Sequence, residues 1–295
     1  MHSLEDILKH PSEYSFCNIK VLKFYKCADL TCIFTVNVAS SLTKLERLTV
    51  SQCPLIESLV KVDNSGANKA IKLLNTIFEV VALGVRDSEF NNESQTTVVK
   101  LPKLREVDLE EVNGLLYLWE TNEWRQLELP NLTRLSIHNC YKLRHVFTTS
   151  MVGSLMQLQE LHVTHCTYMW EIIKKDDDSQ RKVLPCLKSL KLEHLQYLQA
   201  FCLWDKEFML PSLTTLVIKQ CPSLSVFTNG FVAAPKLKVI ETNEGFIDLG
   251  EQDINSYIIT HKQEEDNYDL WHIQTEGESA EGQSNLQMMN QIKNC

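Results

Sequence analysis

The stretch "LTRLSIHNCYKLRHV", from Leu132 to Val146, decides the fold of this chain. Its apolar residues follow the spacing L-x-x-L-x-L-x-x-C-x-x-L-x-x-L, in which Ile, Val, Phe or Met can replace Leu. The same spacing recurs in "IKVLKFYKCADLTCI" from Ile19, "LERLTVSQCPLIESL" from Leu45, "LQELHVTHCTYMWEI" from Leu158 and "LTTLVIKQCPSLSVF" from Leu213. Two further copies, "LREVDLEEVNGLLYL" and "LKSLKLEHLQYLQAF", have Val112 or Leu195 where the others have cysteine. The chain is therefore built from internal repeats.

The second leucine of each copy fixes the phase of the repeats. It falls at Leu22, Leu48, Val107, Leu135, Leu161, Leu190, Leu216 and, in a weaker last copy, Ile240. Repeats with a period of roughly 20–29 residues and an L-x-x-L-x-L core are typical of leucine-rich repeats. Because strand side chains alternate, these leucines should point inward from short strands. The pattern predicts an α/β-type solenoid, a leucine-rich-repeat horseshoe of eight or nine repeats. Its parallel β-strand ladder would line the concave face, and irregular or short helical segments would form the convex side.

One interval in this series is twice as long as the others. Leu48 and Val107 are 59 residues apart, whereas the other neighbours are 24 to 29 apart. A degenerate repeat with Phe78, Val80 and Leu83 would divide the interval in two. Alternatively, an insertion with an amphipathic helix over 70–81 would fill it. Both interpretations stay open. The predicted domain organisation is a lead-in at 1–15, a repeat domain at 16–245 with the insertion or degenerate repeat at 60–100, and an acidic tail at 246–295.

The cysteine position recurs five residues after the phase leucine. It is occupied by Cys27, Cys53, Cys140, Cys166 and Cys221. Val112 and Leu195 replace cysteine in two repeats, and neither side chain can bind a metal or act as a nucleophile. The position therefore selects a small buried group, and free cysteine is among the most buried residue types. We expect structural, reduced and inert thiols.

Disulfides and zinc are the alternatives for these cysteines. Cys140 and Cys166 should lie on adjacent strands, roughly 5 Å apart, which would permit a bridge. However, the N-terminal "MHSLEDILKHPSEY" has no apolar core of the kind found in secretory leaders. An intracellular, cytoplasmic setting with reduced thiols is the consistent expectation. No C-x-x-C pair occurs, which disfavours zinc.

Composition and motifs exclude several classes of function. No apolar run approaches the ~20 residues that span a bilayer, so no membrane span is expected. Between residues 246 and 295 lie ten acidic and two basic residues, a charge of −8 out of the total of −9. That tail has little periodicity and is expected to be disordered. There is no basic footprint for nucleic acid. A nucleophile elbow, a phosphate loop and paired carboxylates are also missing, so we expect neither catalysis nor a cofactor.

The outward positions of the predicted strands form the candidate partner-binding surface, because open solenoids present this face for binding. The candidate residues are Lys23, Tyr25, Arg47, Glu106, Asp108, Glu110, Glu111, Arg134, His138, His162, His165, Lys191, Glu193, His194 and Lys219. The charge along this surface passes from basic to acidic and then to histidine-rich. The acidic residues should repel one another and favour a basic partner. The alternative is that these positions are merely solvated.

Two smaller groups have competing interpretations. His138, His165 and His194 follow consecutive strands, and Glu193 could join them at a metal. They lack the H-x-H or H-E-x-x-H spacing of metal sites, which disfavours a metal there. Trp119 and Trp204 hold matching positions in "YLWETNEWRQLELP" and "FCLWDKEFMLP". They are expected to pack on the convex side, with exposed interface anchors as the alternative.

The repeats also resemble a known family. The pattern "LPxLxxLxLxxCxxL", alternating with loops such as "LWETNEW" and the acidic "IIKKDDDSQ", is similar to the leucine-rich-repeat region of plant intracellular immune receptors. The most similar class is the coiled-coil nucleotide-binding leucine-rich-repeat disease-resistance proteins, and the resemblance covers about Phe16 to Glu241. It implies recognition of a protein partner: a pathogen effector, a guarded host protein, or a nucleotide-binding module in cis or trans.

Two features depart from the family pattern. The nucleotide-binding motif G-x-x-x-x-G-K-[ST] does not occur, and the signalling coiled coil is missing. A repeat-only relative, a truncated product or a fragment is therefore expected. The alternative function is a substrate adaptor of a ubiquitin ligase. That function would need an F-box helix pair, and only about 15 residues precede the first repeat.

Overall fold

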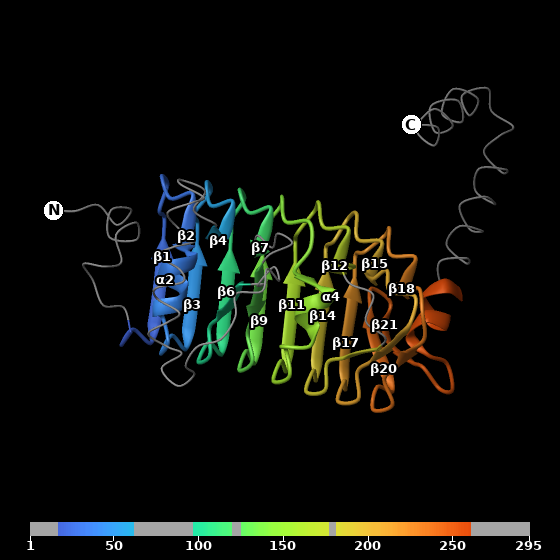
Figure 1. Ribbon diagram of the computed structural model, residues 1–295. Coiled ribbons are helices and arrows are strands. Elements are labelled where there is room, and N and C mark those ends of the chain that lie inside the picture. Colours follow the sequence, from blue (N-terminus) through green and yellow to red (C-terminus); the bar gives the residue numbers. More distant parts are fainter. Residues whose placement is uncertain (1–16, 62–96, 120–124, 177–180, 261–295) are drawn as a thin grey trace, which may run out of the picture.

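The chain folds into a solenoid whose successive turns lie side by side in sequence order (Figure 1). The structure, a computed structural model, describes residues 17–61, 97–119, 125–176 and 181–260. Within these ranges, every turn contributes one strand to a long sheet, and the rest of the turn closes behind it. The predicted leucine-rich-repeat solenoid is confirmed.

The long sheet has nine strands in the described residues, in the order β1-β3-β6-β9-β11-β14-β17-β20-β21. Their bounds are β1 (Val21–Tyr25), β3 (Arg47–Ser51), β6 (Glu106–Glu110), β9 (Arg134–His138), β11 (Glu160–Thr164), β14 (Ser189–Glu193), β17 (Thr215–Lys219), β20 (Val239–Thr242) and β21 (Gly245–Asp248). The first eight are parallel to their neighbours, and β21 returns antiparallel to β20.

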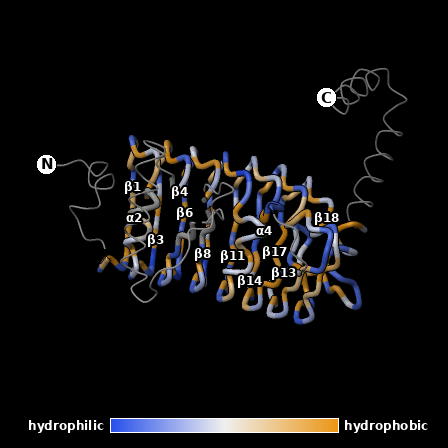
Figure 2. Tube along the Cα trace, viewed as in Figure 1, coloured by the Kyte–Doolittle hydropathy of each residue, from blue (hydrophilic) through white to orange (hydrophobic). Residues whose placement is uncertain are grey.

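The register of the long sheet confirms the predicted phase. Leu135 pairs with Leu161, and the same position pairs across every parallel contact from Leu22 to Ile240. Leu48 and Ile240 are fully buried, as are the phase residues between them apart from Leu216 at 1% exposure, while Leu22 at the open end is partly buried. These side chains form one inner column. Figure 2 shows the hydrophobic segments recurring from turn to turn along the solenoid.

Pairing of β3 with β6 resolves the 59-residue interval. Leu48 pairs directly with Val107, so no strand lies between these two repeats. The strands that follow them, β4 (Ser58–Lys61) and β7 (Tyr117–Trp119), are also direct neighbours. A degenerate repeat with a strand between them is therefore not compatible with the long sheet, and residues 62–96, which connect the two repeats, lie outside the described residues. The suggested helix at 70–81 lies outside the described residues.

The side opposite the long sheet carries more strand than predicted. In the described ranges, four short sheets close the turns. They are β2 (Cys32–Thr35), β4 and β7; β10 (Phe147–Thr148), β12 (Glu171–Lys174), β15 (Ala200–Cys202) and β18 (Val226–Thr228); β13 (Arg181–Val183), β16 (Glu207–Met209) and β19 (Val232–Ala233); and β5 (Thr97–Lys100) with β8 (Arg125–Glu128). The helices α2 (Val36–Ser41) and α4 (Thr149–Val152) are short. Repeating apolar residues on this side favour ladders between turns over long helices.

Trp204 belongs to the interior of the solenoid. Its side chain is 1% exposed, and the amines of Lys175, Lys182 and Lys206 lie 5.5 to 5.7 Å from the ring centroid. The predicted packing role is therefore confirmed for Trp204, and the alternative of an exposed interface anchor is wrong for this residue. The side chain of Trp119 lies outside the described set.

Residues 245–260 pack over the last repeat. This differs from the predicted organisation, in which the acidic tail begins at residue 246. Strand β21 pairs with β20, and residues 254–260 are helical. Leu249, Ile254 and Ile258 are 7%, 2% and 5% exposed and join the core. An open solenoid end would leave its last apolar residues in water, and this segment buries them. Residues 261–295 lie outside the described part of the chain.

Candidate partner-binding surface

A left-handed residue ends the long-sheet strand in seven repeats. The residue just before the cysteine position has φ between 50° and 57° in Lys26, Gln52, Glu111, Asn139, His165, His194 and Gln220. In the first six repeats, its N–H donates to the carbonyl of the last strand residue in the next repeat, at 2.9 to 3.1 Å. In the seventh, the N–H of Gln220 donates to Asn243 Oδ1 at 3.0 Å. This bond extends the ladder one residue past each strand and turns the chain away from the sheet.

The cysteines after this turn face the core. Cys53, Cys140 and Cys166 are fully buried, whereas Cys27 and Cys221 are half-buried. Each of the five thiols donates to the carbonyl of the residue two positions earlier, at 3.3 to 3.8 Å.

Burial makes these thiols poor nucleophiles. It raises the pKa of Cys140 to about 12 and that of Cys221 to about 11, and it raises the pKa of Cys166 well above its usual range. The thiolate is the reactive form of cysteine, and it is scarce at neutral pH in these positions.

Outward side chains of the long sheet stack in three rows, because the parallel strands pair without a shift. We call these rows and the row of left-handed residues the outer face. The first row is Val21, Arg47, Glu106, Arg134, Glu160, Ser189 and Thr215; the second is Lys23, Thr49, Asp108, Ser136, His162, Lys191 and Val217; the third is Tyr25, Ser51, Glu110, His138, Thr164, Glu193 and Lys219. All fifteen predicted surface residues lie on the outer face: twelve in these rows, and Glu111, His165 and His194 in the left-handed row.

The acidic part of the outer face is partly neutralised within the chain. Arg47 Nε lies 2.7 Å from Glu106 Oε2, and Arg134 Nη2 lies 3.4 Å from the same atom and 3.5 Å from Asp108 Oδ1. The hydrogen bond from Arg47 lowers the pKa of Glu106. The expected unrelieved repulsion is therefore wrong for Glu106 and Asp108. The register places Arg47 and Arg134 on either side of Glu106, and Arg134 also reaches Asp108.

Glu110 and Glu111 remain without a cation. Glu110 accepts a hydrogen bond from Ser51 Oγ at 3.1 Å, and Glu111 accepts one from Gln52 Nε2 at 3.0 Å. Within the described residues, no salt bridge reaches either carboxylate. Both carboxylates are therefore uncompensated negative charges near the middle of the outer face.

The C-terminal half of the outer face pairs its charges differently. Lys191 Nζ lies 2.9 Å from Glu193 Oε2 on the same strand. Lys219 pairs with Glu241 of β20, and this hydrogen bond raises the pKa of Lys219. Little net charge is left for a partner in this half.

Three imidazoles stack at the strand ends of this half. The ring centroids of His165 and His194 are 4.0 Å apart with the planes nearly parallel, and His138 packs edge-on at 5.0 Å from His165. Burial, followed by the two neighbouring histidines, lowers the pKa of His165, which favours its neutral form. In the part of the chain described, no three His, Cys, Asp or Glu side chains converge as metal ligands.

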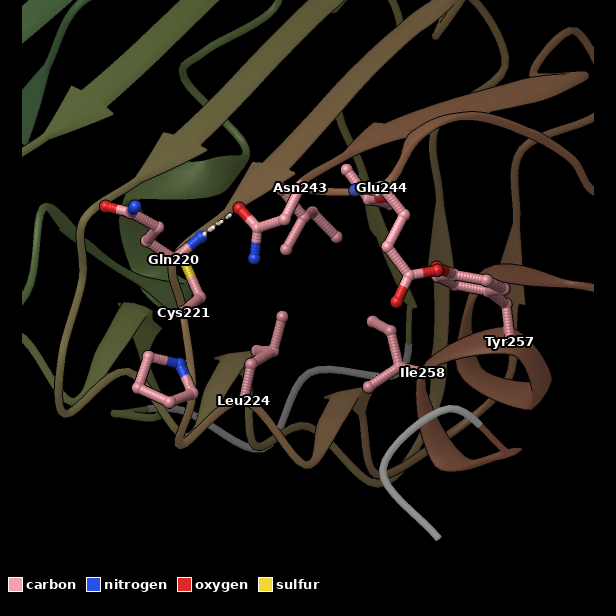
Figure 3. A pocket seen from close by; sticks show the side chains of 10 residues that line it. Gln220, Cys221, Leu224, Asn243, Glu244, Tyr257 and Ile258 are labelled. Atoms are coloured by element: carbon pink, nitrogen blue, oxygen red, sulfur yellow. Dashed lines mark hydrogen bonds between the residues drawn. The ribbon is translucent and has the colours of Figure 1, made fainter. Parts of the chain in front are cut away.

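A small cavity separates the last repeat from the segment 245–260 (Figure 3). Its volume is about 160 Å³, and Cys221, Leu224, Tyr257 and Ile258 are among its lining residues. Ligand pockets usually have volumes of roughly 300–1,000 Å³. This cavity is smaller and touches the outer face only at Gln220, so we interpret it as a packing seam.

Comparison with known proteins identifies the repeats. The family described as plant disease resistance protein RPS2-like, leucine-rich repeats, matches residues 1–167, more than half of the chain. Comparisons with curated proteins and with solved structures gave no match. Among the described residues, no helix has the length and apolar character needed to cross a membrane.

Proposed function

Because the chain belongs to the family of RPS2-like plant disease-resistance leucine-rich repeats, we propose that its outer face binds a protein partner with a basic surface. The observation that supports this is the pair Glu110 and Glu111, which form no salt bridge among the described residues. By contrast, Arg47 and Arg134 pair with Glu106, and Arg134 pairs with Asp108. A basic partner would complete the charge pairing that the chain leaves unfinished.

The nucleotide-binding module of a disease-resistance protein is the partner we propose first. It would be restrained in cis or in trans, and a pathogen effector or a guarded host protein would bind or release the same surface. The family membership supports this assignment.

We also propose that the module acts inside the cell and has no catalytic activity of its own. The five repeat cysteines are free thiols, as expected in a reducing compartment. The raised thiol pKa values support a structural role for the repeat cysteines.

Charge reversal at the two unpaired carboxylates tests the proposal. Lys219 and Lys26 hold the equivalent positions in other repeats, so Glu110→Lys and Glu111→Lys fit the same backbone. Titration against a coiled-coil nucleotide-binding module from the same genome should show an association rate reduced by roughly tenfold or more at low salt, since charge acts mainly on encounter.

A matched control has the same change in net charge away from the outer face. Glu57→Lys with Glu251→Lys alters two exposed acids outside the rows, and it should leave association unchanged. Equal rates for the wild type and the Glu110→Lys, Glu111→Lys variant would remove the outer face as the contact surface.

A further inference from the structure

A cavity at the edge of the solenoid carries positive charge and aromatic side chains that the proposed function does not use. It has a volume of about 510 Å³, within the usual range for ligand sites. Its lining residues lie where the chain leaves the turn after the cysteine position and enters β7 and β12. Both strands are labelled in Figure 1. We call this cavity the edge cavity.

Three cations line the edge cavity, and the described residues offer none of them a salt-bridge partner. Lys142, Arg144 and Lys174 are exposed, and none forms a salt bridge in the part of the chain described. The lining contains a single acidic residue, Glu171, on the same strand as Lys174. The site is therefore positive in a chain whose net charge is −9.

Aromatic rings complete the lining. Trp170 and Tyr168 are 58% and 55% exposed, and Tyr168 stacks on Tyr197 of the next repeat with ring centroids 5.9 Å apart. Tyr117 lies across the cavity lining, 5.3 Å from the ring of His145. Large aromatic side chains exposed in this way offer apolar faces beside the cations, which suits a ligand with both negative charge and aromatic groups.

The chain itself contains a segment of that composition. Residues 264–271 read "EEDNYDLW", with four carboxylates, one tyrosine and one tryptophan in eight positions. We call it the acidic–aromatic segment. It lies outside the described residues, but its attachment point is described. Asn255, in the helical segment 254–260, accepts hydrogen bonds from the backbone N–H groups of Phe227 and Thr228 in β18, at 2.9 and 3.0 Å.

The distance from this attachment point is short. Strand β18 lies two steps from β12 in the same sheet, which is about 10 Å at the usual strand spacing of about 4.8 Å. Arg144 belongs to the next turn, about 5 Å further. Eight extended residues after residue 260 can span about 26 Å, so Tyr268, Asp269 and Trp271 can reach the cavity.

We propose that the acidic–aromatic segment of the same chain occupies the edge cavity. Its carboxylates pair with Lys142, Arg144 and Lys174, and its aromatic residues pack against Trp170 and Tyr168. A tethered segment binds at a high effective concentration, so even modest contacts keep it in place. The tail would then shield a basic surface from acidic molecules while the outer face stays open.

Cross-linking tests the contact directly in the full chain. A zero-length carbodiimide reagent joins lysine amines to carboxylates in contact. Mass spectrometry should find Lys142 or Lys174 joined to Glu264, Glu265, Asp266 or Asp269. Mixing isotope-labelled and unlabelled chains distinguishes links within one chain from links between copies.

Proteolysis measures how strongly the segment is held. Chymotrypsin cleavage after Tyr268 and Trp271 should be at least fivefold slower in 50 mM salt for the wild type than for a Lys142→Glu, Lys174→Glu variant. Lys103→Glu with Lys236→Glu is the matched control, because both lysines are exposed, have no salt bridge among the described residues and lie outside the cavity lining. Adding Glu264→Lys and Glu265→Lys to the cavity variant should restore protection.

Links within one chain, protection that the cavity variant loses, and rescue by the reversed charges would support the proposal. Cross-links found only between copies would overturn it. So would equal cleavage of the wild type and the cavity variant, or an equal loss of protection in the control. These readouts follow the tail and not the partner of the outer face, so a failure here leaves the proposed function standing.

Discussion

The two halves of the outer face share the same strand register but differ in how their charged side chains pair. In the N-terminal half, Arg47, Glu106 and Arg134 pair across three strands. In the C-terminal half, Lys191 pairs with Glu193 on its own strand, Lys219 pairs across to Glu241 of β20, and imidazoles stack where the strands end. Cross-strand pairs depend on which repeats are neighbours, whereas same-strand pairs do not. The N-terminal half therefore records the packing of β3 on β6, and the C-terminal half is close to neutral.

The inner column should be equally important to both halves, and it carries the largest expected effect. Leu135→Ala in the N-terminal half and Leu190→Ala in the C-terminal half each remove a fully buried side chain. Each should lower the free energy of unfolding by about 2–5 kcal/mol. Urea denaturation measures it, with the 52% exposed Leu55 changed to Ala as the near-neutral control. A loss below about 1 kcal/mol in either variant would show that the inner column does not stabilise that half.

The cysteine position should be sensitive according to its depth. Cys166→Ser places a hydroxyl in a fully buried site and should cost about 1–2 kcal/mol of stability, even though the new hydroxyl can still donate to the carbonyl of Thr164. Cys27→Ser at the half-buried first repeat should cost less. Thermal denaturation of both variants would check the order. Native-state labelling by a thiol reagent should also be slower at Cys166 than at Cys27, and the reverse order would contradict the burial argument.

Acid should destabilise the two halves in different pH windows. Burial lowers the pKa of His165, so the unfolded chain takes up its proton first; this stabilising effect is present above about pH 6.5 and is lost as the pH falls toward the folded-state pKa. Arg47 lowers the pKa of Glu106, so that effect is present above about pH 4.5 and is lost as the pH falls further.

Two single substitutions separate these windows. His165→Asn should flatten the loss of melting temperature between pH 6.5 and 5, because Asn139 already holds the equivalent left-handed position. Glu106→Gln should flatten the loss below pH 4.5. Melting curves across pH 3 to 8 are the measurement, and a loss that stays identical in both variants would assign acid sensitivity to other groups.

The smallest effect should come from the arginine bridges. Exposed ion pairs contribute about 0.2–1 kcal/mol each, and Arg47 and Glu106 are partly exposed. A double-mutant cycle with Arg47→Gln and Glu106→Gln should give a coupling in that range at low salt. The coupling should vanish in 1 M salt if Coulomb attraction carries it. A coupling that does not change with salt would point to packing of the arginine stem instead.

The repeat phase was predictable from sequence because it depends on a local pattern, and every phase residue from Leu22 to Ile240 pairs as expected. The bridges of the N-terminal half were not. Arg47 and Glu106 hold the same position in their repeats, but a degenerate repeat between them would have placed them two strands apart. Which repeats are neighbours is decided by long-range packing, which the interval of 59 residues did not reveal.

Two further features were not predicted from the sequence, for different reasons. The left-handed turn had a visible signal, since the position before the cysteine is polar in all seven repeats, but polarity alone does not specify the sign of φ. The composition of residues 246–260 predicts a tail because acidic residues dominate their surroundings. Ile254 and Ile258, spaced as on one helix face, were the signal for burial. Of the candidate surface, the positions were predictable and the pairing of their charges was not.

The unshifted register of the long sheet has an evolutionary consequence. Neighbouring outer positions stand a fixed ~4.8 Å apart along each row, and the leucines that set this spacing lie on the opposite side of the sheet. A substitution on the outer face can therefore change one contact while its neighbours keep their places. Selection can therefore act on such positions almost one by one. The gain or loss of a repeat instead adds or removes a whole strand of outer-face positions at once. A chain of this kind can acquire a new binding preference through few mutations, without first solving a new folding problem.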